Sequence, residues 1–80
     1  MATYELFIMP SCPYCQKVLR FMEARGIELP LRDITLDPAA RERLVRVGGK
    51  AQVPCLSIDG TPMYESDNII SYLRRNVAKA

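Results

Sequence analysis

The chain has 80 residues, of which 49% are hydrophobic and 25% are charged, and its formal net charge is +2. This length allows one small domain at most, and this apolar content excludes an intrinsically disordered chain. The net charge is too small to indicate nucleic-acid binding, and no apolar segment approaches the length of a membrane span. We therefore expect a single domain over residues 1–80, with neither nucleic-acid nor membrane partners.

The first predicted element is a strand from Tyr4 to Met9. Its apolar run does not alternate with polar residues, which is typical of a central strand that is covered on both faces. A helix is predicted to follow from Pro13 to about Arg25, because apolar residues recur at helical spacing and proline suits the first helical turn. Gly26 can take the positive φ that ends a helix.

A strand over Glu28–Ile34 and a helix from Pro38 to about Val47 are predicted next. Pro30 cannot donate a backbone hydrogen bond, so this strand is expected at an edge of the sheet. Asp37 is expected to cap the second helix, and Gly48-Gly49 to end it. A strand, a helix and a second strand in this order predict parallel strands with a right-handed crossover.

The last part of the chain predicts a hairpin and a helix. The third strand covers Gln52–Asp59, and Asp59-Gly60 is a favoured two-residue turn into an antiparallel strand, Thr61–Tyr64. Ser66 is expected to cap the final helix, with Asp67 in its first turn. The predicted fold is therefore α/β, in the order β-α-β-α-β-β-α, with a mixed four-stranded sheet flanked by helices.

Two thiols lie where the first strand passes into the first helix, in Cys12-Pro13-Tyr14-Cys15. A helix N-terminus presents free N–H groups and the positive end of the helix dipole, and both favour a thiolate. The dipole alone is expected to lower the pKa of Cys12 by about one unit. One exposed nucleophile with a second thiol within reach predicts a redox pair, with Cys12 and Cys15 as the catalytic residues.

Other uses of these thiols are less well supported by the sequence. A structural metal would need more ligands, but the chain offers only one further cysteine, Cys55, and no histidine. A structural disulfide over so short a loop would restrict the unfolded chain little. Three cysteines, with no visible secretory signal, indicate a reducing cytoplasm. Cys55 itself is expected to be a small buried hydrophobe.

Basic residues cluster in the second predicted helix and just after it. We interpret this cluster as a solvated helix face, with anion binding as the alternative. Its members are Arg41, Arg43, Arg46 and Lys50.

The predicted topology, together with the Cys-Pro-Tyr-Cys motif, resembles the thioredoxin fold and, within it, the dithiol glutaredoxins. The segment Gln52-Val53-Pro54 is similar to a family segment whose proline is cis. Leu56 to Ser66 is similar to the N-terminal domain of glutathione transferases, in which a Glu-Ser pair holds the γ-glutamyl end of glutathione. The resemblance covers the whole chain. It implies a glutathione-dependent enzyme that reduces glutathione mixed disulfides and protein disulfides, with Cys12 as the nucleophile and Cys15 as the resolving thiol.

The same resemblance implies a set of residues that bind glutathione. The backbone of the residue before the cis proline would pair with the cysteinyl part of glutathione. The acidic and serine residues at the start of the last helix would take the γ-glutamyl carboxylate and amine. The implied binding residues are Tyr14, Gln52, Val53, Pro54, Glu65, Ser66 and Asp67.

The chain departs from the glutaredoxin pattern at two places. Met9 stands where many glutaredoxins carry lysine, so one expected cation is missing, and Tyr64-Glu65 stand where many carry two glycines. We expect a cytoplasmic monomer that uses glutathione and holds no metal. One alternative is a module that holds an iron–sulfur cluster through Cys12, against which Pro13 argues. A second is a redoxin coupled to thioredoxin reductase, which would not need the Glu-Ser pair. A stand-alone transferase would need a helical second domain that this sequence does not contain.

Overall fold

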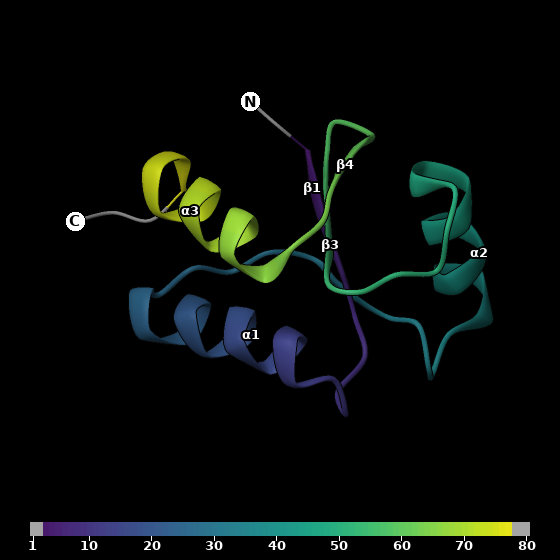
Figure 1. The fold of residues 1–80 in the computed structure, drawn as a ribbon, viewed down its shortest axis with the longest axis horizontal. Helices are drawn as coiled ribbons and strands as arrows, with labels where there is room; N and C mark the ends of the chain where they lie inside the picture. Colours follow the sequence, from purple (N-terminus) through teal and green to yellow (C-terminus); the bar gives the residue numbers. More distant parts are fainter. Residues whose placement is uncertain (1–2, 78–80) are drawn as a thin grey trace.

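The computed structural model of the chain describes residues 3–77, so residues 1–2 and 78–80 of the predicted domain lie outside the described part. Seven helices and strands follow the predicted order (Figure 1). The strands are β1 (Tyr4–Ile8), β2 (Leu31–Asp33), β3 (Cys55–Ile58) and β4 (Thr61–Met63), and the helices are α1 (Pro13–Arg25), α2 (Pro38–Gly48) and α3 (Ser66–Asn76).

The strands form one mixed sheet in the order β2-β1-β3-β4. β1 is central, parallel to β2 and antiparallel to β3, and β3 is antiparallel to β4. The central position of β1 and the edge position of β2 are both confirmed. Each edge strand has only three residues, and Pro62 lies within β4.

Several strands are shorter than the sequence predicted. β1 and β4 each end one residue early, at Ile8 and Met63. β2 begins at Leu31, because its pairing with β1 starts there and Pro30 has no N–H to donate. β3 begins at Cys55 rather than Gln52, and the preceding Pro54 likewise has no N–H to donate to the ladder.

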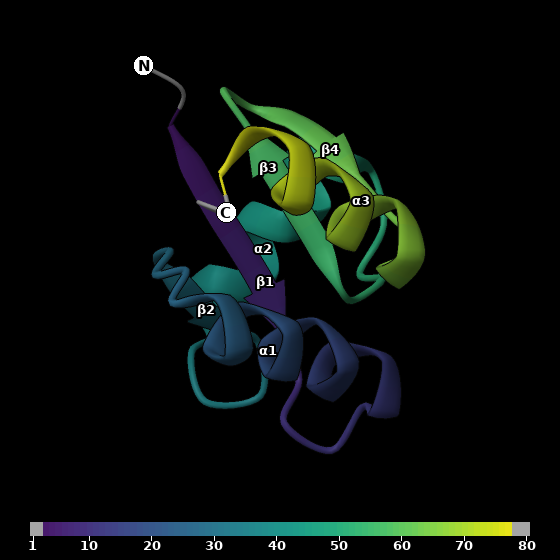
Figure 2. The same ribbon diagram turned by 90° about the vertical axis from the view of Figure 1, so that its left-hand side faces the viewer.

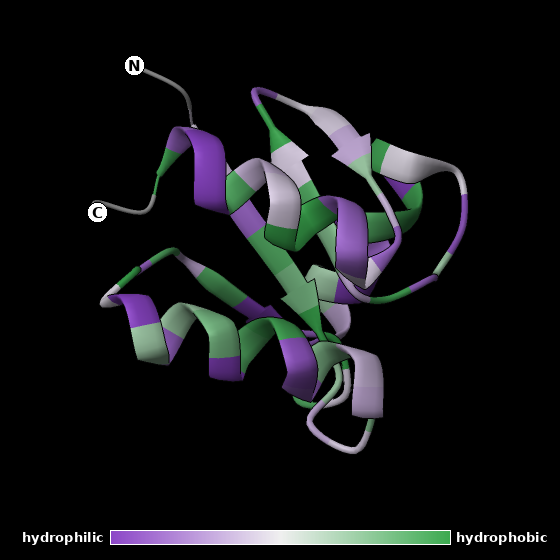
Figure 3. Ribbon diagram, turned by 60° about the vertical axis from the view of Figure 1, so that its left-hand side comes forward, coloured by the Kyte–Doolittle hydropathy of each residue, from purple (hydrophilic) through white to green (hydrophobic). Residues whose placement is uncertain are grey.

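Alternation along β1 divides the interior between two faces of the sheet. Leu6 and Ile8 pack in the core beneath α1 and α3, whereas Phe7 packs with Leu44 of α2 and with Cys55. Figure 1 shows α1 and α3 on one side of the sheet and α2 on the other, and Figure 2 shows β1 crossing behind α1. The apolar colouring in Figure 3 follows the central strands between these layers.

The ends of the helices and the hairpin turn are mostly where local chemistry predicts them. Gly26 ends α1 with a φ of 65°. The Asp37 carboxylate accepts a hydrogen bond of 3.0 Å from the Ala39 N–H and caps α2. Asp59 and Gly60 have φ values of 52° and 86°, the positive values that a type I′ hairpin turn requires.

The predicted cap of the last helix is wrong. Ser66 is the first helical residue of α3, and Glu65 occupies the cap position with a φ of 73°. A side-chain cap needs extended backbone at the residue before the helix, and Glu65 does not have it. The Ser66 side chain is instead buried.

The basic residues around α2 do not form one surface. Arg43 binds Glu5, Lys50 lies 4.6 Å from the centre of the Tyr64 ring, and Arg46 is 3.9 Å from Glu42. Arg41 and Arg46 fit the predicted solvated face, whereas Arg43, although also exposed, binds the buried Glu5 carboxylate, a contact that the sequence did not predict.

Candidate active site

The two predicted catalytic cysteines occupy different positions in the first turn of α1. Cys12 stands at the cap position with extended backbone and is partly exposed, whereas Cys15 is completely buried. Pro13 opens the helix, where its missing N–H leaves no hydrogen bond unmade. The site therefore has one accessible sulfur, on Cys12, and one buried sulfur, on Cys15, in the same helical turn.

The surroundings of the two thiols move their pKa values in opposite directions. Burial raises the pKa of Cys12, but hydrogen bonds from the Cys15 N–H, the Cys15 thiol and the Tyr14 N–H outweigh it, so the net pKa is lowered. Burial raises the pKa of Cys15 to about 11, although the Met9 N–H donates to its sulfur at 3.5 Å. Cys12 is therefore suited to attack as a thiolate, and Cys15 holds its proton at neutral pH.

A groove of about 420 Å³ lies beside this turn, between α1, α3 and the segment that leads into β3. The structure brings together around it all seven residues that the resemblance implied. The lining consists of Tyr14, Lys17, Gln52, Val53, Pro54, Glu65, Ser66 and Asp67.

The peptide bond between Val53 and Pro54 is cis, as the resemblance implied. Pro54 is buried, Val53 is half-buried and Gln52 is exposed. The backbone of this segment lies outside the β3 ladder, which begins at Cys55. Its polar groups are therefore placed to pair with a peptide-like ligand in the groove.

Glu65 has the most unusual backbone in the groove. Its φ of 73° and ψ of 118° lie in a region that side chains rarely adopt, at a cost of about 1–3 kcal/mol. Many glutaredoxins have glycine here, which would not incur this cost. Such strain is typical of functional positions, and here it leaves the Glu65 carboxylate exposed at the start of α3.

Sequence reasoning missed Lys17, which forms an ion pair with Asp67 across the groove, joining α1 to α3. Both side chains are largely exposed, so the pair contributes little stability. It does place a cation in a site that lacks the usual lysine at Met9. The spacing of Tyr14 and Lys17, three residues apart on one helix, could have indicated that they share a face.

Residues 3–77 contain neither a candidate metal site nor a candidate membrane-spanning helix. No three histidine, cysteine or acidic side chains lie close enough together there to hold a metal ion. No helix in this part of the chain is both long enough and apolar enough to cross a bilayer.

The mixed sheet, its three helices and a cysteine at the first helix N-terminus together define a glutaredoxin-like thioredoxin fold. The family described as "Glutathione S-transferase, N-terminal domain" matches residues 6–80. The chain belongs to this family.

Individual relatives agree with this assignment. The chain is 30% identical over 69 residues to a probable glutaredoxin from Synechocystis, covering 85% of this chain and 78% of that protein. It is 26% identical over 69 residues to glutaredoxin 3 of Escherichia coli K12, covering 86% and 83%. Among solved structures, the thioredoxin-like protein BC3987 matches with a TM-score of 0.75 and 27% identity, covering 91% of this chain and 97% of that one. These relatives support a glutaredoxin- or thioredoxin-like redox role.

Proposed function

We propose that residues 1–80 act as one glutaredoxin domain that uses glutathione to reduce glutathione mixed disulfides and protein disulfides. One observation carries the proposal: a cysteine with a lowered pKa at a helix N-terminus adjoins a groove lined by a backbone segment outside the β3 ladder and by a glutamate with positive φ. The match to a glutathione transferase domain family supports glutathione as the ligand of that groove.

The reaction begins when the Cys12 thiolate attacks the glutathione sulfur of a mixed disulfide. A disulfide forms between Cys12 and glutathione, the original disulfide breaks, and the substrate leaves as a thiolate that takes a proton from water. The thiolate of a second glutathione then attacks the bound glutathione sulfur. Oxidised glutathione leaves and the Cys12 thiolate is restored. The lowered pKa of Cys12 helps both steps, as attacking and as leaving thiolate.

Cys15 has a narrower role in this scheme. Its pKa of about 11 keeps it protonated at neutral pH, so it competes poorly with free glutathione for the mixed disulfide at Cys12. It is needed when the substrate is a protein disulfide. There the Cys12 thiolate first forms a mixed disulfide with the protein and one protein thiolate leaves. Cys15 gives its proton to water and attacks the Cys12 sulfur, so that the mixed disulfide breaks and the second protein thiolate leaves and is protonated. Two glutathiones later reduce the Cys12–Cys15 disulfide and leave as oxidised glutathione.

Different residues of the groove bind different parts of glutathione. The Val53 backbone pairs with the cysteinyl part of the tripeptide, beside Pro54. Glu65 and Asp67 face the γ-glutamyl ammonium, and the N–H groups at the start of α3, at Ser66, face its carboxylate. Tyr14 and Gln52 close the sides of the groove.

The test is turnover of hydroxyethyl disulfide with glutathione and glutathione reductase, compared with turnover supported by thioredoxin reductase. We expect activity with the first system and little with the second. Cys12→Ser should abolish it, whereas Cys15→Ser should keep glutathione-dependent activity and lose reduction of protein disulfides. Unchanged activity in Cys12→Ser would refute the proposed nucleophile, and turnover only with thioredoxin reductase would favour a thioredoxin-like redoxin.

The setting of this activity is also part of the proposal. We expect a cytoplasmic monomer, which is consistent with three free cysteines. Sedimentation of the reduced protein, with and without glutathione, tests the oligomeric state.

A further inference from the structure

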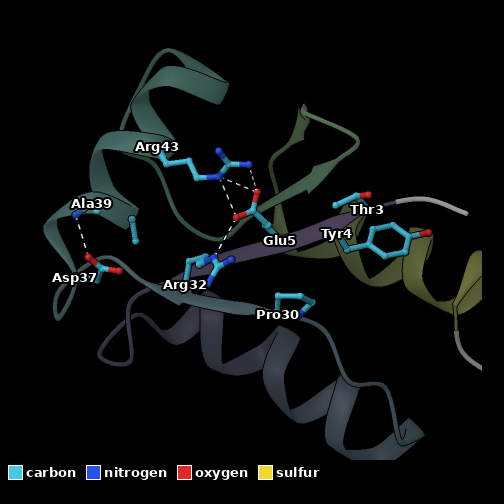
Figure 4. A pocket seen from close by; sticks show the side chains of 9 residues that line it. Thr3, Tyr4, Glu5, Pro30, Arg32, Asp37, Ala39 and Arg43 are labelled. Carbon is cyan, nitrogen blue, oxygen red and sulfur yellow. Dashed lines mark hydrogen bonds and ion pairs between the residues drawn. The ribbon is translucent and has the colours of Figure 1, made fainter.

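A second pocket, of about 500 Å³, lies on the other face of the sheet, between β1, β2 and the start of α2 (Figure 4). It shares no lining residue with the redox groove. It lies near the beginning of β1, whereas Cys12 follows the end of that strand. The thiol chemistry uses none of the residues that line this pocket.

A buried carboxylate forms the base of the pocket. Glu5, in the central strand, is only 7% exposed. Arg43 donates to it from Nε at 2.8 and 2.9 Å and from Nη2 at 2.5 Å, and Arg32 donates from Nε at 3.0 Å. Hydrogen bonding to Arg43, opposed by burial and aided by Arg32, lowers the pKa of Glu5, so it is ionised at neutral pH.

Ion clusters of this kind rarely add much to the stability of a fold. Burying the Glu5 carboxylate costs solvation free energy that its two half-exposed arginines offset, and apolar residues of similar size often stabilise a protein as well or better. An apolar residue at Glu5 could extend the core that Phe7 begins on the same face. The cluster instead fixes two guanidinium planes at the base of the pocket.

These guanidinium groups have donors to spare. Hydrogen bonds within residues 3–77 use Nε of Arg32 and Nε and Nη2 of Arg43. Both terminal nitrogens of Arg32 and Nη1 of Arg43 make no hydrogen bond to those residues. The two side chains are about half exposed, at 47% and 52%. Planar, pre-oriented guanidinium groups of this kind suit the two oxygens of a carboxylate.

The charged and apolar residues that line the pocket indicate which class of ligand it can bind. The two arginines carry two positive charges, and Glu5 and Asp37 carry two negative ones, so the lining is neutral overall and a singly charged anion suits it better than a dianion. The Asp37 carboxylate in the pocket already accepts the Ala39 N–H. Pro30, Ala39 and Ala40 add apolar side chains to the lining. The volume lies in the range of small-molecule sites.

We infer that this pocket binds a small organic monocarboxylate, with its carboxylate on the Arg32 and Arg43 guanidinium groups and its hydrocarbon body against the apolar part of the lining. Glu5 acts as a positioning residue, because it orients both arginines. The inference does not depend on the proposed redox function.

The experiment is a titration of the ¹⁵N-labelled full chain followed by NMR, including the arginine Nε–H signals. The probes are benzoate, cyclohexanecarboxylate and hexanoate, with benzamide and inorganic phosphate as controls. We expect at least one carboxylate to give saturable shifts at Arg32, Arg43 and Ala39, with a Kd of order 1 mM. Benzamide and phosphate should bind at least about tenfold more weakly.

Arg32→Gln should weaken carboxylate binding at least about tenfold while Arg43 still holds Glu5. The matched control is Arg46→Gln, which changes an exposed arginine of α2 outside the pocket and should leave the affinity unchanged. The inference is overturned if no carboxylate saturates by about 20 mM, roughly twenty times the expected Kd. Equal binding of benzamide or phosphate, or shifts confined to the redox groove, would also overturn it. The wild-type titration decides the matter even if Arg32→Gln does not fold.

Discussion

Cys15 and Glu5 are two buried acids on opposite faces of one small sheet, and their surroundings act on them in opposite ways. Cys15 is 0% exposed and Glu5 is 7% exposed. Burial raises the pKa of Cys15 to about 11, and one backbone N–H from Met9 offsets little of that rise. The pKa of Glu5 is lowered, because two arginines outweigh its burial.

Burial and ion pairing have opposite effects on the pKa of a buried acid. Burial alone favours the neutral form of an acid, whereas paired cations restore the charged form. On the face of the sheet that α1 covers, burial keeps a proton on Cys15, and the N–H groups of the first helical turn point to Cys12. The face beneath α2 uses arginines to keep a fixed charge on Glu5. One end of β1 is therefore suited to proton and electron transfer, and the other to holding a permanent charge.

The largest expected effect is the difference in reactivity between Cys12 and Cys15. The pKa of Cys12 is lowered and that of Cys15 is raised to about 11, more than two units above an ordinary cysteine pKa of about 8.5, so their thiolate populations near pH 7 differ by more than about 100-fold. Alkylation by iodoacetamide should differ by a comparable factor, because the complete burial of Cys15 counters the higher intrinsic nucleophilicity of its thiolate. Rates measured from pH 5 to 11 on Cys15→Ser and Cys12→Ser, each with Cys55→Ser, test this. Similar rates for the two thiols would contradict the assigned environments.

Removing Arg43, the main partner of Glu5, should make the Glu5 carboxylate respond to burial as the Cys15 thiol does. In Arg43→Gln the carboxylate stays buried with only Arg32, so its pKa should rise as that of Cys15 does. We expect a loss of about 1–3 kcal/mol in the free energy of unfolding. Urea denaturation measures this loss. Arg46→Gln on the same helix is the control and should change stability by less than about 0.5 kcal/mol. Equal effects of the two changes would mean that the contact between Arg43 and Glu5 contributes nothing to the free energy of unfolding.

Glu65 extends the comparison to an exposed carboxylate, which makes no ion pair within residues 3–77. If it meets the γ-glutamyl ammonium, Glu65→Gln should raise KM for glutathione by roughly 3–30-fold. The rate of reduction of a small disulfide that lacks glutathione should be the same as in the wild type, and the pKa of Cys12 should change little. Steady-state kinetics on both substrates decide between these outcomes. Equal losses on the two would show that Glu65 supports the fold or the thiolate instead.

The smallest effect is expected from replacing the buried carboxylate itself. Glu5→Met should change the free energy of unfolding at pH 7 by no more than about 1 kcal/mol. Because the folded pKa of Glu5 is lowered, its stabilising contribution is present above its unfolded pKa of about 4.3 and is lost as pH falls further. The decline in stability on acidification should therefore be shallower in the variant. A steeper decline would contradict the direction of the pKa shift.

Features that depend on a few neighbouring residues could be predicted from the sequence. Pro13 and Asp37 start helices, Gly26 ends one, and Asp59-Gly60 turns a hairpin, because each acts through local backbone geometry. The order of elements along the chain and the edge position of β2 followed from these boundaries and from the hydrophobic pattern, whereas the antiparallel pairing of β1 with β3 was not predicted. Only the resemblance to a known family predicted that the seven groove residues lie together.

Contacts between distant residues could not be predicted in this way. Glu5 meets Arg32 and Arg43 across 27 and 38 residues, and Lys17 meets Asp67 across 50. Nothing local distinguishes these charges from solvated ones. A glutamate with positive φ is equally hard to foresee, because local preference opposes it and only the surrounding fold holds it there.

The lengths of the two outer strands affect how the protein behaves at high concentration. β2 and β4 each offer only three residues to a strand from another molecule, and one of those in β4 is Pro62. Pro30 directly precedes β2. Short edges that carry or adjoin proline present few free backbone groups, which is how many natural sheets avoid templating fibrils. The folded sheet therefore leaves little backbone on which an aggregate could grow.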